Sequence, residues 1–230
     1  MSELDVRSFT VGPVQENSYI VRLPNADRAV MIDPGDEAER LIAALQALGI
    51  TTVEAILLTH THFDHVGAVA PVARATGAPV YCPELETHIL ADINGHMRLP
   101  GFGPFESYDA DETVSGGENL TLAGLEFEVS FVPGHSPGHV AYALKDHDAL
   151  FSGDVLFQGS VGRVDLPGGD WPTLLSSIDS LMKAYPAETT VYPGHMGLTT
   201  LGVERDTNPF LRELVGSAPA SAPNRPAHQN

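Results

Sequence analysis

The segment Thr59-His-Thr-His-Phe-Asp-His65 decides the fold, because it places four side chains that commonly bind metals within six residues. It follows an apolar run, Val53–Thr59, that is typical of a buried strand, and it precedes an Ala-rich helical pattern, Val66–Thr76. The segment is therefore predicted to form a loop between a strand and a helix. A His-rich loop without function is the alternative, but histidine has no packing reason to cluster.

Four ligand-type side chains in one short loop cannot all face the same ion. Alternation along an extended segment sends His60, His62 and Asp64 to one side, and His65 diverges where the helix begins. Two neighbouring ions would use that spread.

Three later segments share one pattern, in which a strand ends with Gly followed by His or Asp. They are Phe131-Val-Pro-Gly-His135, Leu150-Phe-Ser-Gly-Asp154 and Val191-Tyr-Pro-Gly-His195. Each alone is typical of a simple turn, but glycine also lets a backbone turn sharply and approach closely. Ligands in open α/β sheets gather beyond the carboxyl ends of strands. Together with His60, four strands are predicted to bring ligand-type side chains to one edge.

Imidazole and carboxylate ligands without a thiolate suit zinc, iron, manganese or cobalt. One ion would take three histidines, a second would take Asp64, His65 and His195, and the carboxylate of Asp154 would bridge them. A water held between the ions would be the nucleophile of a hydrolase. The predicted ligands are His60, His62, Asp64, His65, His135, Asp154 and His195, and Asp64 and Asp154 are also predicted to be catalytic.

The composition fits one globular domain that does not bind nucleic acid. The chain has 230 residues, 43% of them hydrophobic, and we expect a single domain over residues 1–215. The tail at 216–230, with its Ala, Pro, Ser and Asn, is predicted to be disordered. A formal charge of −18 disfavours nucleic acid, because affinity for phosphates depends on Lys and Arg.

A membrane-bound or exported protein is not expected. No stretch approaches the roughly 18 apolar residues that a membrane helix needs, and MSELDVRSFT lacks the basic start and apolar run of a signal peptide. Cys82 is the only cysteine, so an intramolecular disulfide is excluded, and a buried apolar role is expected for it. We therefore expect a cytoplasmic protein, and the sequence leaves its oligomeric state open.

Apolar runs of strand length alternate with helical patterns in both halves of the chain, which favours an α/β sandwich over a β-barrel. The first three strands should form an antiparallel meander. Besides Val66–Thr76, the predicted helices are Glu37–Leu48 with Asp36 as N-cap, Glu84–Ile93 and Pro172–Tyr185. The predicted strands are Val6–Val11, Ser18–Leu23, Arg28–Asp33, Val53–Thr59, Pro79–Cys82, Leu120–Leu122, Leu125–Val132, Val140–Leu144, Ala149–Ser152 and Thr189–Tyr192.

The His-rich segment, followed in order by His135, Asp154 and His195, resembles the metallo-β-lactamase superfamily over about residues 5–200. The resemblance implies a four-layer αββα sandwich, in which two mixed β-sheets pack face to face with helices outside. Within the superfamily the chain most resembles short hydrolases similar to glyoxalase II, also called hydroxyacylglutathione hydrolase. The supporting stretches are residues 159–170 and 198–211.

This resemblance implies thioester hydrolysis on S-acyl glutathione or a similar small thiol, with two divalent ions, zinc first and iron or manganese as alternatives. A hydroxide that bridges the ions would attack the acyl carbon. Full-length glyoxalase II has a C-terminal helical region that helps to hold glutathione, whereas only about 35 residues follow His195 here. The thiol carrier therefore stays open.

Other activities remain in competition. Persulfide dioxygenases share the fold and would use one iron on residues matching His60, His135 and Asp154, a two-His-one-carboxylate site. A lactone or β-lactam hydrolase would use the same metal-bound hydroxide as the thioesterase. However, β-lactamases usually lack an Asp at the position of Asp154 and are exported. A metal-binding scaffold without turnover is the non-enzymatic alternative.

Several residues outside the predicted ligands have two interpretations each. Asp33 either accepts the free N–H of a ligand histidine or makes a turn. Arg163 and Asp165 either shape the wall of the site or form a surface ion pair. His139 is expected in a turn or the core rather than on a metal, and the loop Leu99–Tyr108 either covers an acyl group or packs on the preceding helix.

Overall fold

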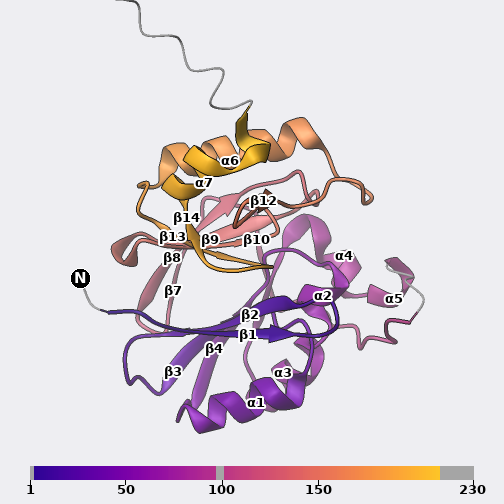
Figure 1. The fold of residues 1–230 in the computed structure, drawn as a ribbon. Coiled ribbons are helices and arrows are strands. Elements are labelled where there is room, and N and C mark those ends of the chain that lie inside the picture. Colours follow the sequence, from indigo (N-terminus) through magenta and orange to yellow (C-terminus); the bar gives the residue numbers. More distant parts are fainter. Residues whose placement is uncertain (1–2, 97–100, 213–230) are drawn as a thin grey trace, which may run out of the picture.

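The computed structural model describes residues 3–96 and 101–212. Two six-stranded sheets pack face to face, and helices cover the outer face of each sheet (Figure 1). The predicted four-layer αββα sandwich is therefore confirmed.

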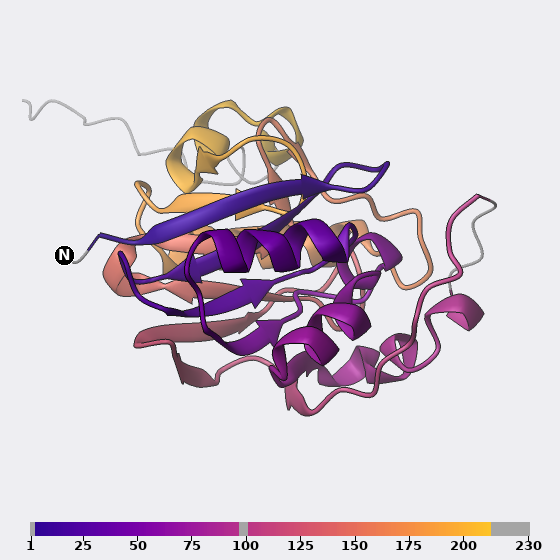
Figure 2. The same ribbon diagram turned by 90° about the horizontal axis from the view of Figure 1, so that it is seen from below.

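The first sheet comes from the N-terminal half of the chain, in the order β1-β2-β3-β4-β5-β6. Its first three strands are antiparallel, as the predicted meander requires, and β3 to β6 are parallel. Helices α1 (Ala38–Ala47) and α3 (Val69–Thr76) cover its outer face, as Figure 2 shows from below. The strands are β1 (Asp5–Val11), β2 (Glu16–Arg22), β3 (Arg28–Ile32), β4 (Thr52–Leu57), β5 (Val80–Pro83) and β6 (Glu112–Val114).

The second sheet has the order β14-β13-β10-β9-β8-β7, and in it only β10 and β13 run parallel. Helices α6 (Trp171–Ala184) and α7 (Leu201–Thr207) cover its outer face (Figure 1). The strands are β7 (Asn119–Leu122), β8 (Leu125–Phe131), β9 (Val140–Leu144), β10 (Ala149–Gly153), β13 (Thr190–Pro193) and β14 (Thr199–Thr200).

Shorter elements connect these layers. They are α2 (Phe63–Val66), α4 (Thr87–Leu90), α5 (Ile93–His96), a hairpin of β11 (Leu156–Phe157) with β12 (Ser160–Val161), and the 3-10 turns η1 (Glu84–Glu86), η2 (Lys145–His147) and η3 (Pro209–Leu211).

Alternation along the strands explains why both faces of each sheet are covered. In β3, Val30 and Ile32 belong to the core between the sheets, whereas Ala29 and Met31 belong to the core under α1 and α3. Such strands have continuous apolar sequences because both of their faces are buried. A third apolar core lies under α6, so the sandwich has one core between each pair of layers.

The helix predicted over Val66–Thr76 is present as α3, but its predicted start is wrong, because α2 and α3 are separate helices with a break at Gly67 and Ala68. The N–H of Ala68 donates to the carbonyl of Pro34 at 3.0 Å. A Cβ on Gly67 would lie 2.5 Å from the carbonyl oxygen of Gly35, so the close approach of these two segments requires glycine.

The predicted N-cap of α1 is also wrong. Glu37 rather than Asp36 is at this position, with φ of 53°, and no side chain caps the helix. The carboxylate of Glu37 accepts a hydrogen bond from the N–H of Gly12 at 3.0 Å, which ties the start of α1 to the β1–β2 turn. The helix predicted at Glu84–Ile93 is divided into η1, α4 and the start of α5.

The predicted domain boundary at 215 and the tail at 216–230 lie outside the described residues. Across residues 3–96 and 101–212, no helix combines the length and the apolar character needed to cross a membrane. Cys82 is fully buried in the core under α3, as predicted.

Candidate metal centre

The seven predicted ligands meet at one edge of the sandwich, where strands of both sheets end. The first sheet supplies the loop after β4 and helix α2, and the second sheet supplies the loops after β8, β10 and β13. Four of the strands therefore deliver ligand-type side chains to a common edge, as the repeated Gly-His and Gly-Asp pattern predicted. The side chains that meet there are His60, His62, Asp64, His65, His135, Asp154 and His195.

Three histidines form the first half of the cluster. The Nδ1 atom of His62 lies 3.1 Å from Nε2 of His60 and 2.8 Å from Nε2 of His135. Because these three ring nitrogens converge from two loops, one cation could bind all three of them.

The second half combines histidines and carboxylates. Nε2 of His195 lies 3.2 Å from Oδ2 of Asp64, and Nε2 of His65 lies 3.3 Å from Oδ1 of Asp154. The other oxygen of Asp154 lies 3.5 Å from Nε2 of His135 and 3.6 Å from Nε2 of His195. Asp154 thus lies between the two halves, where a bridging carboxylate is expected.

Two buried atoms of this cluster have no hydrogen-bond partner among the described residues, namely Nε2 of His65 and Oδ1 of Asp154. A buried polar atom without a partner costs free energy, and a bound cation would remove that cost. The donor set therefore fits two divalent cations, and the role of each residue as a ligand stays a prediction.

The two halves differ in their electrostatics. Burial lowers the pKa of His60 well below its usual range and lowers the pKa of His62 to about 4, so both rings are neutral and keep a lone pair for a cation. Burial also lowers the pKa of His65, but the carboxylates of Asp154 and Asp64 outweigh it and raise this pKa well above its usual range. The second half therefore attracts positive charge.

Asp33 holds two of the histidines in place, which decides between its two interpretations. Its Oδ2 accepts a hydrogen bond from Nδ1 of His65 at 3.0 Å and another from the hydroxyl of Thr59 at 2.6 Å. The same hydroxyl lies 3.1 Å from Nδ1 of His60 and accepts a hydrogen bond from it. Both rings are thereby oriented with Nε2 toward the cluster.

Backbone carbonyls orient two further rings. Nδ1 of His135 donates to the carbonyl of Arg163 at 2.7 Å, and Nδ1 of His195 donates to the carbonyl of Gln15 at 3.2 Å. The side chain of Arg163 pairs with exposed Asp165 at 2.6 Å. Arg163 therefore acts on the site through its backbone, and its ion pair is at the surface.

His139 is buried in the core, one of the two positions expected for it, and it is not in the groups of converging side chains. Its ring stacks on that of His60, with centroids 4.6 Å apart, and its Nε2 accepts the N–H of Asp154 at 3.0 Å. It therefore fixes the backbone of the residue between the two halves.

Glu86 is a residue that the sequence analysis missed. Its buried carboxylate accepts the N–H and the hydroxyl of Thr61 at 2.8 and 2.9 Å on one oxygen. The other oxygen accepts the hydroxyl of Ser136 at 2.5 Å and the N–H of Gly138 at 2.8 Å. This carboxylate therefore joins the loop after β4 to the loop after β8, and these two loops supply all three histidines of the first half.

Glycine is needed before at least two of the predicted ligands. A Cβ on Gly194 would lie 2.2 Å from Oδ1 of Asp154 and 2.7 Å from Cε1 of His65. Gly134 has φ of 128°, and a Cβ there would lie 2.3 Å from the backbone nitrogen of Leu174. Close approach and an unusual φ, both expected from the sequence, explain these two positions.

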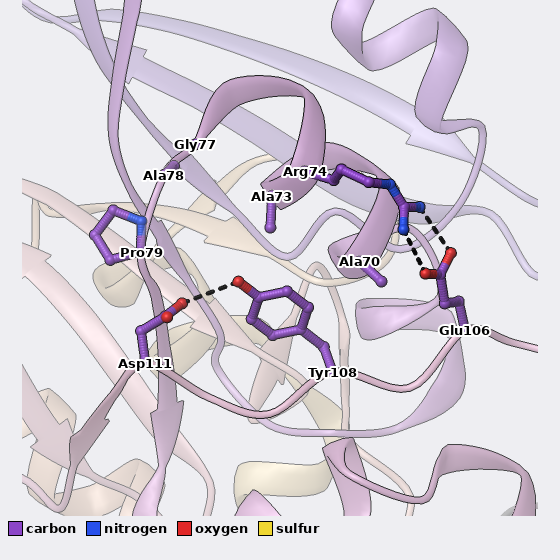
Figure 3. Close-up of a pocket in the computed structure, with 9 residues that line it drawn as sticks. All are labelled: Ala70, Ala73, Arg74, Gly77, Ala78, Pro79, Glu106, Tyr108 and Asp111. Atoms are coloured by element: carbon purple, nitrogen blue, oxygen red, sulfur yellow. Dashed lines mark hydrogen bonds and ion pairs between the residues drawn. The ribbon is translucent and has the colours of Figure 1, made fainter.

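A separate pocket of about 510 Å³ lies between α3 and the segment before β6. Figure 3 shows the ion pair of Arg74 with Glu106 and the hydrogen bond of Tyr108 to Asp111 around it. None of the seven converging residues lines this pocket, so it has no part in the metal chemistry.

Comparison with known proteins agrees with this geometry. A family model described as the metallo-beta-lactamase superfamily matches residues 11–195. A probable metallo-hydrolase, YqgX of Bacillus subtilis, is 42% identical over 207 residues, which are 89% of this chain and 96% of that protein. The hydroxyacylglutathione hydrolase GloC of Haemophilus influenzae is 34% identical over 210 residues, which are 90% of this chain and 98% of that protein.

Two solved structures are similar over most of their length. The B3 metallo-beta-lactamase BLEG-1 superimposes with a TM-score of 0.84 and 44% identity, covering 90% of this chain and 99% of the other. TTHA1623 in a di-iron-bound form superimposes with a TM-score of 0.79 and 46% identity, covering 89% and 100%. Because the family model and these relatives span nearly all of the described fold, this chain belongs to the metallo-β-lactamase superfamily and is a metal-dependent hydrolase of that superfamily.

Proposed function

We propose that this protein hydrolyses thioesters of a small thiol, such as S-acyl derivatives of glutathione, with two divalent ions. The observation that carries the proposal is the position of Asp154 between the two halves of the ligand cluster, with Oδ1 3.3 Å from Nε2 of His65 and Oδ2 3.5 Å from Nε2 of His135. When two ions are bound, they supply a water that ionises near neutral pH and they polarise the carbonyl of the substrate.

The residues of the chain would hold the ions in a fixed relation. Asp154 would set their separation, and Asp33 would keep the rings of His60 and His65 directed at them. A thiol has a pKa near 8.5, so its thiolate leaves readily and no strong general acid is required. A nucleophilic Ser or Cys is likewise not required.

Similarity supports this reading over a single-iron oxygenase, and the geometry offers a place for a second ion. The relative from Haemophilus influenzae is named a hydroxyacylglutathione hydrolase. An oxygenase with one iron would use a single group of two histidines and one carboxylate. Here Asp64, His65 and His195 form a further group beside the three histidines, which suits a second ion. We propose zinc as the metal, with iron as the alternative because TTHA1623 is described in a di-iron-bound form.

Hydrolysis of β-lactams is a second candidate. It is favoured by the 44% identity to a structure described as a B3 metallo-beta-lactamase. The same pair of ions would activate water for either substrate, so the two candidates differ only in what the surrounding loops admit.

Metal analysis paired with a substrate panel tests these proposals. The purified protein should contain two ions per chain and should cleave S-acylglutathiones faster than lactones or β-lactams. A chelator should remove the activity, and added zinc should restore it. One iron per chain with oxygen uptake on a thiol persulfide would overturn the proposal, and preferential β-lactam cleavage would favour the second candidate.

A further inference from the structure

A small apolar cavity lies next to the second half of the metal centre. It has a volume of about 130 Å³ and is enclosed by the β1–β2 turn, the loop after β3, the start of α2 and the segment Gly101–Phe105. We call it the Phe63 pocket, and its wall comprises Val11, Gly12, Pro13, Val14, Gly35, Asp36, Phe63, Asp64, Gly101, Phe102, Gly103 and Phe105.

We propose that the Phe63 pocket receives the acyl group of the substrate and selects for its length. The inference rests on the proposed thioesterase function and names the part of the thioester that the pocket recognises. It assigns a role to much of the loop Leu99–Tyr108, whose residues 99 and 100 lie outside the described part of the chain.

The position of the pocket relates it to the reaction centre. Asp64 lines the pocket, and its carboxylate lies 3.2 Å from Nε2 of His195 in the metal cluster. A carbonyl carbon attacked at that cluster carries two substituents, the acyl chain and the sulfur. The substituent on the side of Asp64 would enter the pocket.

The chemistry of the wall selects the acyl chain over the thiol carrier. The ring of Phe63 contacts the rings of Phe102 and Phe105, with centroids 4.9 and 5.5 Å away. Asp36 is the charged residue of the wall that is not a predicted metal ligand, and no Lys or Arg is among the described lining residues. The wall therefore offers an anionic carrier such as glutathione no cationic partner, whereas an uncharged alkyl chain would gain from burial.

The volume sets the length of the chain that fits. Its volume of about 130 Å³ is well below the roughly 300–1,000 Å³ of pockets that bind drug-sized ligands, so it suits a short chain. An acyl group a few carbons long should fill it. One methylene in an apolar pocket changes kcat/KM by about 10- to 200-fold, so the metal-loaded enzyme should prefer a butanoyl thioester to the acetyl thioester of the same thiol by at least about tenfold.

Two substitutions should shift this preference in opposite directions. Val14 is partly exposed on the β1–β2 turn, so Val14→Phe can project a ring into the pocket without disturbing the core. It should bring the ratio of kcat/KM for butanoyl over acetyl toward one. Phe102→Ala should enlarge the pocket and move the optimum to longer acyl groups. Val203→Phe, at a more exposed position on α7, is the matched control and should keep the wild-type ratio.

The panel should use one thiol with acyl groups of two to eight carbons, and the metal content of each variant should be measured alongside. Opposite shifts in Val14→Phe and Phe102→Ala at wild-type metal content support the acyl pocket. If the wild type cleaves thioesters but both variants keep its chain-length profile, the pocket assignment is overturned and the thioesterase survives. If the metal-loaded wild type cleaves no thioester, the proposed function itself fails, and the acyl pocket fails with it.

Discussion

The substitution Glu86→Gln tests whether one buried carboxylate sets the positions of three predicted metal ligands. It keeps the shape of the side chain, but an amide offers one acceptor oxygen in place of two. Each carboxylate oxygen of Glu86 accepts two hydrogen bonds, one oxygen from Thr61 and the other from Ser136 and Gly138. In the variant, one backbone N–H and one hydroxyl would face an NH2 group; the hydroxyl can turn and accept from it, but the N–H loses its acceptor.

The size of the effect follows from these four contacts. A hydrogen bond to a charged group contributes about 1.5–3 kcal/mol, and an N–H left buried without an acceptor costs about 1–3 kcal/mol more. Removal of a buried charge offsets part of this loss, and we expect a net decrease of about 3 kcal/mol in urea unfolding of the metal-free protein. The loops after β4 and β8 would lose their common anchor. Metal should then bind about 10–100-fold more weakly, the range typical of changes to the partners of metal ligands.

Glu204→Gln separates loss of stability from loss of the site. Glu204 is as deeply buried and accepts hydrogen bonds from Thr199, Gly159 and Asn208 at 2.5, 2.8 and 2.8 Å. None of these partners directly flanks a predicted ligand. The control should lose comparable stability and keep its metal affinity, measured by competition with a chelator. Equal metal affinity in the Glu86→Gln and Glu204→Gln variants would refute the proposed role of Glu86.

Three further perturbations give distinct readouts. Asp154→Ala removes oxygens that lie near His135 in the first half and His65 in the second. It should abolish thioester hydrolysis and leave fewer than two ions by metal analysis, and full turnover would contradict its bridging role. Removal of the metal by a chelator should lower the free energy of unfolding by about 2.7 kcal/mol, compared with protein in free metal at 100 times its Kd. Coincident denaturation curves with and without the chelator would exclude tight binding. Asp5→Asn should destabilise the protein at pH 7. Burial raises the pKa of Asp5, but the guanidinium groups of Arg22 and Arg7 outweigh this effect and hold the pKa below its ordinary value of 3.8. The stabilisation by the ion pairs of Asp5 is present above pH 3.8 and is lost as pH falls through the lower folded-state pKa. The unfolding curves of variant and wild type should therefore converge in acid. A difference in stability that stays constant with pH would contradict the ion pair.

The convergence of the seven side chains could be predicted because each position depends on local chemistry. A strand that ends in Gly followed by His or Asp specifies both a direction and a close approach, as Gly194 beside Asp154 shows. The layers could be predicted for a similar reason, since continuous apolar strands require cover on both faces. Neither inference needs knowledge of distant contacts.

The features that could not be predicted depend on segments far apart in sequence. Nothing in the local sequence distinguishes Glu86 from Glu84. Only the fold brings the carboxylate of Glu86 to Ser136 and Gly138, which lie 50 and 52 positions later in the chain. The break between α2 and α3 lies at Gly67, and the contacts that accompany it, from Ala68 to Pro34 and from Gly67 to Gly35, are to a segment more than 30 positions earlier. Asp33 was ambiguous for the same reason, because its hydrogen bond to His65 spans 32 positions.

Each half of the metal centre draws ligands from both sheets, and this connects metal binding to the packing of the sandwich. His60 and His62 follow the first sheet and converge with His135 from the second, while Asp64 and His65 converge with His195. An ion in either position would therefore join the two sheets at the edge where their inner core ends. The affinity for metal must depend on how well that core fixes the distance between the sheets, because a ligand displaced by a few tenths of an ångström no longer reaches the ion. We therefore expect metal affinity to depend also on residues that contact no ion. These are Glu86, which joins the two loops, and the apolar core behind the loops.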